Sequence, residues 1–206
     1  YADVMFVVRS VGERTESCCI DALRRSGAPQ ENIVVVNETP FSESLRKTYR
    51  LGFESGKRWV FCVDADVIVR GDTVNQIMGV ASGMKGSMLG LQGMMLDKLT
   101  CSIRAGGVHV YRCEYLDKAA SAIPGEGASM RPESSAIQAL GMAGHGWLTL
   151  PYVTGIHDFG QFHQDIFRKC YLHANKHMSN IPRLLPIWRR LARDDLDFRV
   201  AIAGLV

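Results

Sequence analysis

Two aspartates, Asp64 and Asp66, directly follow an apolar run, Trp59 to Val63. Such a run predicts a buried strand. Side chains two residues apart on an extended chain point the same way, so both carboxylates are expected on one side of the strand end. Close like charges repel unless a cation neutralises them, and Mg2+ or Mn2+ takes oxygen ligands and bridges to phosphates. The pair therefore indicates a divalent-metal site, with a simple Asx turn as the alternative.

Strand and helix patterns alternate through the first 65 residues. The elements that they predict must position Asp64 and Asp66. The expected elements are strands over Val4 to Val8, Ile33 to Val36 and Trp59 to Val63, and helices over Glu13 to Ser26 and Phe41 to Ser55. The strands lack polar alternation, as parallel strands covered on both faces do. We therefore predict an α/β fold with right-handed crossovers. Its ligands would bind at the carboxyl ends of the strands, where the aspartates stand.

The pattern changes after residue 70, where fewer helices separate the strands. Helices are expected over 72–83, 114–122 and 133–142, and strands over 87–96, 105–112 and 148–153. The second half should therefore add mixed, partly antiparallel strands. We expect a first domain over residues 1–180 and a basic amphipathic helical tail over 181–206. That tail either packs on the domain or contacts a partner or a membrane surface.

Composition limits the possible functions. The 206 residues are 47% apolar, enough for a core without disulfides, and the net charge of +3 is too small to indicate a nucleic-acid partner. Six scattered cysteines predict free thiols in a reducing compartment. No apolar run approaches the ~20 residues of a membrane helix, and no signal peptide is visible. We expect a cytoplasmic protein, with peripheral membrane association through the tail as the further option.

The chain resembles glycosyltransferases of the GT-A fold, more particularly family 2, over most of residues 4 to 160. Val63 to Val67 matches the DxD motif of that family. Further resemblances are the first strand and nucleotide loop (7–14), the second strand (32–38), the helix before the metal strand (45–52), the Gly-Gly strand beneath the donor sugar (105–112) and a late segment with a histidine (155–159). The resemblance implies the Rossmann-like fold of nucleotide-diphospho-sugar transferases, with a parallel first half and a mixed sheet in the second half.

The same resemblance implies a metal-dependent transferase that moves a sugar from a UDP- or GDP-sugar donor to a hydroxyl acceptor. The acceptor would be a glycan, a lipid-linked or a small molecule, in glycan or envelope polysaccharide synthesis. Mn2+ or Mg2+, held by Asp64, Asp66 and His157, would stabilise the charge of the diphosphate leaving group. His163, His173 and His177 are alternatives to His157.

The remaining site residues are also implied by the resemblance. Glu133 would be the catalytic base, although Ser134 stands where the family has the second residue of an acidic pair. Asp66 would be the more direct metal ligand. The donor-binding residues would be Arg9, Ser10, Glu13, Arg14, Asn37, Arg46, Lys47, Asp64, Gly106 and Gly107.

Three alternatives stay open. Residues 64–72 also resemble retaining, family 8-like enzymes of the same fold, which need no dedicated acidic base, so the inverting mechanism is one of two. The serine at position 134 also suits a nucleotide-sugar-binding module without catalysis. A nucleotidyltransferase would carry a glycine-rich, arginine-containing phosphate loop, and residues 8–13 lack that glycine density.

Overall fold

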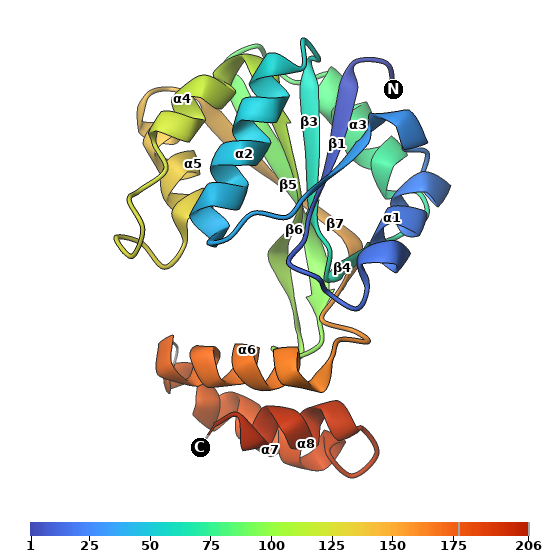
Figure 1. Cartoon of the computed structure of the whole chain (residues 1–206), viewed down its shortest axis with the longest axis vertical. Coiled ribbons are helices and arrows are strands. Elements are labelled where there is room, and N and C mark those ends of the chain that lie inside the picture. Colours follow the sequence, from blue (N-terminus) through green and yellow to red (C-terminus); the bar gives the residue numbers. More distant parts are fainter. Residues whose placement is uncertain (177, 206) are drawn as a thin grey trace.

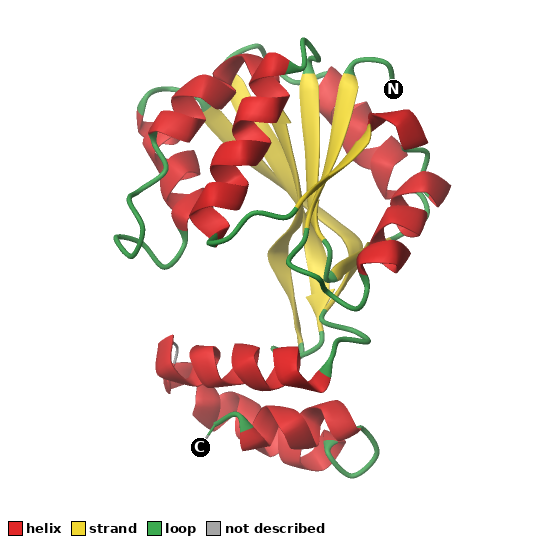
Figure 2. Cartoon of the chain, viewed as in Figure 1, coloured by secondary structure: helices red, strands yellow, loops and turns green. Residues whose placement is uncertain are grey.

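The computed structural model describes residues 1–176 and 178–205, and these form one mixed sheet with helices on both of its faces (Figures 1 and 2). The strands are β1 (Val4–Arg9), β2 (Ile33–Val36), β3 (Trp59–Asp64), β4 (Val67–Val69), β5 (Met88–Asp97), β6 (Ser102–Arg112) and β7 (Gly146–His157). The helices are α1 (Glu16–Arg25), α2 (Phe41–Glu54), α3 (Thr73–Ser82), α4 (Leu116–Ser121), α5 (Pro132–Met142), α6 (His163–Lys176), α7 (Ile181–Leu191) and α8 (Leu196–Ala203).

The sheet has the strand order β2-β1-β3-β6-β5-β7-β4. Strands β2, β1 and β3 are parallel, and β6 then runs antiparallel to both β3 and β5. The last strand, β4, pairs antiparallel with β7, with Val67 opposite His157. This pairing brings the chain just after β3 beside the end of β7. The predicted parallel first half and mixed second half are therefore confirmed.

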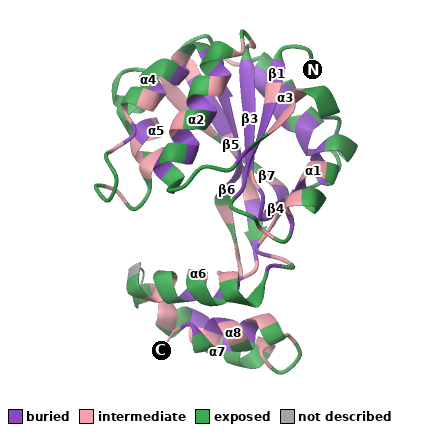
Figure 3. Ribbon diagram, viewed as in Figure 1, coloured by how far each residue is buried: buried purple, intermediate pink, exposed green. Residues whose placement is uncertain are grey.

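The central strands are buried on both faces, which explains why they lack polar alternation. On β3, Phe61 and Val63 pack into the cluster beneath α1 and α3, whereas Val60 and Cys62 pack into the cluster beneath α2 and α4. Figure 3 shows β1 and β3 as buried strands and the outer faces of the covering helices as exposed. A sheet buried in this way leaves its strand ends as the places where polar side chains can gather.

Leu45, Tyr49 and Phe53 follow one another at four-residue steps on α2, but they do not all face the core. Leu45 and Tyr49 are buried, but Phe53 is 51% exposed. Gly52 faces the sheet in its place, because a helix turns by 3.6 residues per turn and the core-facing line drifts. A Cβ atom on Gly52 would lie 2.5 Å from Leu116 Cδ1 and 3.3 Å from Val60 Cβ, so glycine lets α2 pack closely against β3 and α4.

Helices α6, α7 and α8 gather below the sheet and form what we call the helical lobe (Figure 1). Their apolar side chains share one core with Leu99, which lies in the turn between β5 and β6. The Trp188 indole nitrogen donates to the Leu99 carbonyl oxygen at 2.7 Å, and the Lys98 ammonium lies 2.8 Å from Asp195. The lobe is thus fastened to the tip of the β5–β6 hairpin.

The tail predicted over 181–206 begins with α7, which starts at Ile181. Helices α6 and α7 share one apolar core. The predicted boundary between a first domain and a tail, after residue 180, stays a prediction. None of the helices within the described ranges is long and apolar enough to cross a membrane.

Candidate functional site

Three potential metal ligands meet where the ends of β3 and β7 converge: Asp66, His157 and Asp158, here called the Asp66 cluster. One ligand atom from each residue lies within 4.8 Å of the others. Backbone pairing sets this geometry, because β4 binds β7 and the Asp158 amide donates to the Asp66 carbonyl oxygen at 3.1 Å. Asp158 has a φ of +64°, a left-handed conformation that aspartate tolerates better than most residues.

The donor set of the Asp66 cluster suits a divalent cation. Asp66 is buried, and its Oδ1 atom accepts no hydrogen bond from the described residues, although an unpaired buried carboxylate oxygen is costly. Carboxylate oxygens suit Mg2+ and Mn2+, and a histidine nitrogen is a common ligand of metal ions in proteins. These residues therefore fit the metal that the GT-A resemblance implies. Bound there, the metal would act as a Lewis acid toward phosphate oxygens.

His157 is surrounded by carboxylates. Its Nε2 atom lies 3.5 Å from Asp66 Oδ2, and its Nδ1 atom lies 3.0 Å from one oxygen each of Asp158 and Asp97. Burial alone would lower the pKa of His157, but these three carboxylates outweigh it and raise the pKa to about 10. Without a metal, His157 therefore carries a proton at neutral pH, and metal ligation requires that a ring nitrogen lose it.

A second polar group lies at the end of β1 and centres on Arg9, which is only 3% exposed. Its guanidinium donates to Asp64 Oδ1 at 2.7 Å and to Glu133 Oε1 at 2.8 Å. The Tyr111 hydroxyl also donates to Glu133 Oε1, at 2.7 Å. We call these four residues the Arg9 network. It ties the ends of β1 and β3 to the first turn of α5.

The Arg9 network explains the ionisation of Glu133. Burial would raise the pKa of Glu133, but the charges of Arg9 and His109 and the hydrogen bonds from Arg9 and Tyr111 outweigh it and lower the pKa to about 2. Partial burial raises the pKa of Asp64 against the opposing charge of Arg9, and the carboxylates of Asp66 and Glu133 raise it further. The two carboxylates that share Arg9 are therefore unequal, and Glu133 is the more firmly ionised.

A pH-dependent stability follows from Glu133. Because its pKa falls from an ordinary value of 4.5 to about 2 on folding, its contribution is present above pH 4.5 and is lost as the pH falls toward 2. We expect Glu133→Gln to be less stable than wild type by about 3 kcal/mol at neutral pH, with the difference narrowing below pH 4.5. Urea unfolding at a series of pH values measures it. Glu54→Gln, on an exposed position of α2, is the control; a difference that stays constant down to pH 3 would contradict the assignment.

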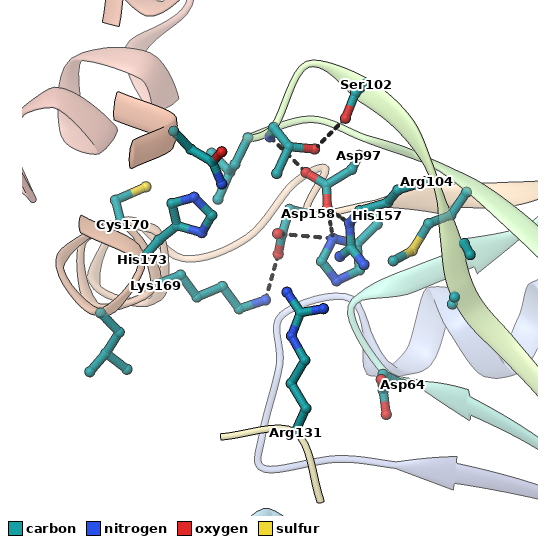
Figure 4. A pocket seen from close by; sticks show the side chains of 18 of the residues that line it. Asp64, Asp97, Ser102, Arg104, Arg131, His157, Asp158, Lys169, Cys170 and His173 are labelled. Atoms are coloured by element: carbon teal, nitrogen blue, oxygen red, sulfur yellow. Dashed lines mark hydrogen bonds and ion pairs between the residues drawn. The ribbon is translucent and has the colours of Figure 1, made fainter. Parts of the chain in front are cut away.

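Two clefts adjoin these groups. The smaller, of about 220 Å³, lies at the ends of β1 and β3 and is lined by Arg9, Ser10, Val11, Glu13, Glu38, Phe41, Ser44, Asp64 and Asp66. The larger, of about 830 Å³, runs between the sheet and the helical lobe. Figure 4 shows Asp158 between the His157 ring and the Lys169 ammonium, with Arg131 reaching toward them from α5's side of the larger cleft. Asp64 lines both clefts and so marks where they meet.

The structure brings together part of the set expected from the sequence. Arg9, Ser10, Glu13 and Asp64 line the smaller cleft, and Gly106 and Gly107 line the larger one together with Glu133. Asp66 and His157 meet in the Asp66 cluster, whereas Asp64 is held by Arg9 and is not part of that cluster.

The other expected donor-binding residues line neither cleft. Arg46 pairs with Glu43 and donates to the Pro124 carbonyl oxygen, and Arg14 lies over the Phe162 ring. Asn37 and Lys47 are exposed. Of the alternative histidines, His163 lies 3.4 Å from Asp197, His173 lines the larger cleft, and His177 lies outside the described residues.

Sequence reasoning missed three charged residues of the site: Asp97, Asp158 and Lys169. Asp158 follows His157 within a segment already singled out, so the adjacent carboxylate was an available signal. Asp97 ends β5, another strand whose end lies at the site. Lys169 lies on α6, far along the chain, and no spacing in the sequence indicates its contact with Asp66.

The glycine pair on β6 is required by its backbone and its neighbours. Gly106 and Gly107 have φ values of +124° and +80°, and a Cβ atom on Gly107 would lie 2.8 Å from Met95 Sδ. We expect Gly107→Ala to lower the free energy of unfolding by at least 1 to 2 kcal/mol, roughly the cost of left-handed backbone for an L-residue. Gly141→Ala is the control, because a Cβ there enters open space on α5 and should stabilise by about 0.4 to 1 kcal/mol. Denaturant unfolding compares the two; equal effects would contradict the prediction.

Comparisons with known proteins place the fold. No family model matches the chain, and no curated protein matches it in sequence. Several solved structures match it in fold. A mannosyltransferase from Pyrobaculum calidifontis in complex with GDP-Man and Mn2+ superposes with a TM-score of 0.53 at 12% identity, over 98% of this chain and 73% of that one. A glycosyltransferase involved in glycosylation of the major capsid of PBCV-1 gives 0.52 at 12% identity, over 76% and 94%. A cytidylyltransferase from Leptospira borgpetersenii gives 0.52 at 10% identity, over 93% and 95%.

The chain therefore has the GT-A-like fold that nucleotide-diphospho-sugar transferases share with nucleotidyltransferases. At 10 to 12% identity, these similarities show the fold alone. Function must be argued from the site.

Proposed function

We propose that this protein is a metal-dependent glycosyltransferase that transfers a sugar from a nucleoside-diphosphate donor to a hydroxyl acceptor. The observation that carries the proposal is the Asp66 cluster, a buried set of metal-type ligands at the strand ends, beside one small and one large cleft. Ligands of α/β sheets bind at such strand ends. That a protein of the same fold was solved with GDP-Man and Mn2+ supports the proposal.

The smaller cleft suits the nucleoside of a UDP- or GDP-sugar. Phe41 lies 5.0 Å from the Arg9 guanidinium and offers an aromatic surface, while Ser10 and Glu38 offer hydrogen-bonding groups. The diphosphate would then pass Asp64 toward the Asp66 cluster, and the sugar would enter the larger cleft near Gly106 and Gly107. Mn2+ or Mg2+ is the proposed cofactor, with Asp66, His157 and Asp158 as its protein ligands and Asp64 beside them.

Glu133 remains the proposed base of an inverting reaction. It lines the larger cleft and is ionised, so it can accept a proton. A carboxylate with a pKa of about 2 is a weak base, and it takes the proton of the acceptor hydroxyl only late in the reaction. The hydroxyl becomes acidic enough once its oxygen has begun to bond to the anomeric carbon.

The acceptor is proposed to be a hydroxyl of a glycan or an envelope polysaccharide, which enters the larger cleft between the sheet and the helical lobe. Residues of the helical lobe, among them Leu172, Arg183 and Trp188, form one wall of this cleft. Exposed arginines of α7, Arg189 and Arg190, provide the surface for the proposed peripheral contact with a membrane.

Calorimetry on the wild-type protein tests the proposed function directly. UDP, GDP and CDP, and then the sugar conjugates of whichever binds, are titrated with Mn2+ and with EDTA. We expect one nucleotide to bind in the micromolar range with Mn2+ and to lose at least tenfold in affinity with EDTA, since several ligand contacts pass through the metal. The nucleoside triphosphates are titrated in the same way, and tighter binding of one of them than of every diphosphate sugar would favour a nucleotidyltransferase. If the folded protein bound no nucleotide at all, the proposed donor site would be wrong.

A further inference from the structure

The Asp66 cluster already has a cation of the chain's own in contact with it. The Lys169 ammonium, from α6 in the helical lobe, donates to Asp66 Oδ2 and to Asp158 Oδ1, both at 2.5 Å. Burial would lower the pKa of Lys169, but the charges of Asp66 and Asp158 outweigh it and raise the pKa above its usual value, so the group is an ammonium. Lys169 thus neutralises the same two carboxylates that would hold the metal.

The oxygens of the cluster leave little room for both cations. Lys169 occupies one oxygen of each aspartate, and Asp158 Oδ2 lies 3.0 Å from His157 Nδ1. Asp66 Oδ1 is buried and has no hydrogen-bond partner among the described residues. A divalent cation bound to both aspartates therefore has to compete with the ammonium for their oxygens.

We propose that Lys169 is the resident counter-ion of the metal site, and that metal binding is an exchange in which the Lys169 ammonium leaves Asp66 and Asp158. This inference rests on the proposed function and names a residue that sets the metal affinity of its site. No bond is made or broken in the exchange, which swaps one set of ionic contacts for another.

The exchange needs only a side-chain movement. The helical lobe is fastened to the β5–β6 hairpin through Trp188 and Lys98, so α6 stays in place. Lys169 also lines the larger cleft, which can receive the released ammonium. There it would lie beside the phosphate-bearing donor, and metal binding would thereby add a positive charge to the cleft in which transfer takes place.

Binding of Mn2+ to the full chain, followed by the electron paramagnetic resonance signal of free Mn2+, tests the exchange. We expect Lys169→Met to bind Mn2+ about tenfold or more tightly than wild type, because a hydrogen bond between charged groups is typically worth about that factor. Lys118→Met is the control: it removes an exposed lysine of α4, away from the cluster and from the helical lobe. Its Mn2+ affinity should equal that of wild type.

Further measurements separate a failure of the exchange from a folding defect and from a failure of the proposed metal site. Lys169→Met leaves buried carboxylates unpaired, so it should melt at a lower temperature than wild type without metal and gain more from Mn2+; Lys169→Gln, which keeps a donor, serves if the methionine variant does not fold. Equal or weaker Mn2+ binding by both Lys169 variants, with binding by wild type lost in Asp66→Ala, overturns the exchange but leaves the metal site standing. Absence of Mn2+ binding in every protein overturns the proposed metal site and the exchange together.

Discussion

Replacing Arg9 by methionine should lower the free energy of unfolding by about 3 to 5 kcal/mol, the usual cost of removing one partner from a buried ion pair. Arg9 is 3% exposed and is the common partner of Asp64 and Glu133. Methionine keeps most of the volume but leaves Glu133 as a buried charge that only the Tyr111 hydroxyl and more distant groups can stabilise. Urea unfolding followed by circular dichroism measures the loss.

Two further variants separate the lost charge from lost packing. Arg70→Met removes an exposed arginine that pairs with Asp72, and it should cost less than about 1 kcal/mol. The double variant Arg9→Met/Glu133→Gln should recover part of the loss, because it no longer buries an uncompensated carboxylate. A single Arg9→Met variant within 1 kcal/mol of wild type would show that the Arg9 network does not hold the strand ends together.

Substitution of Asp66 by asparagine should reduce the proposed metal-dependent sugar transfer on the order of 10²- to 10³-fold. This is the range seen when one group that stabilises transition-state charge is removed. Asparagine keeps the shape of the side chain but removes the charge that a divalent cation needs. Release of nucleoside diphosphate from the donor, measured with saturating Mn2+, gives the rate.

Two further variants are compared with Asp66→Asn: Asp72→Asn is the control, and Asp64→Asn separates donor binding from metal binding. Asp72 is exposed and lies outside both clefts, so its variant should retain wild-type activity. Asp64 contacts Arg9 and not the Asp66 cluster, and we expect its substitution to weaken donor binding more than metal binding. If Asp64→Asn abolished Mn2+ binding while Asp66→Asn retained it, the metal would have to be reassigned to Asp64.

Local pattern was sufficient for most of the elements. Ile33–Val36 forms a strand with the predicted bounds, and α2, α3, β5 and α5 begin and end within two residues of the expected positions. Buried parallel strands and amphipathic helices carry their burial pattern in short stretches of sequence, so neighbouring residues are enough to recognise them. In the tail, helix α7 begins at Ile181, at the start of the predicted range; Pro182 fits its first turn, whereas Pro186 lies inside the helix.

By itself, the sequence determined the α/β class, the mixed second half of the sheet and the presence of an aspartate pair at the end of a buried strand. Only the tertiary structure decided that the two aspartates have different partners, Arg9 for Asp64 and the Asp66 cluster for Asp66. Asp64 still belongs to β3, but Asp66 lies in the turn that follows, so the two-residue periodicity of a strand no longer sets its direction. Asp66 instead meets His157 and Asp158 because β4 pairs with β7, and Lys169 reaches them because the helical lobe packs on Leu99. Such contacts depend on pairing and packing between distant segments, which no local spacing in the chain encodes.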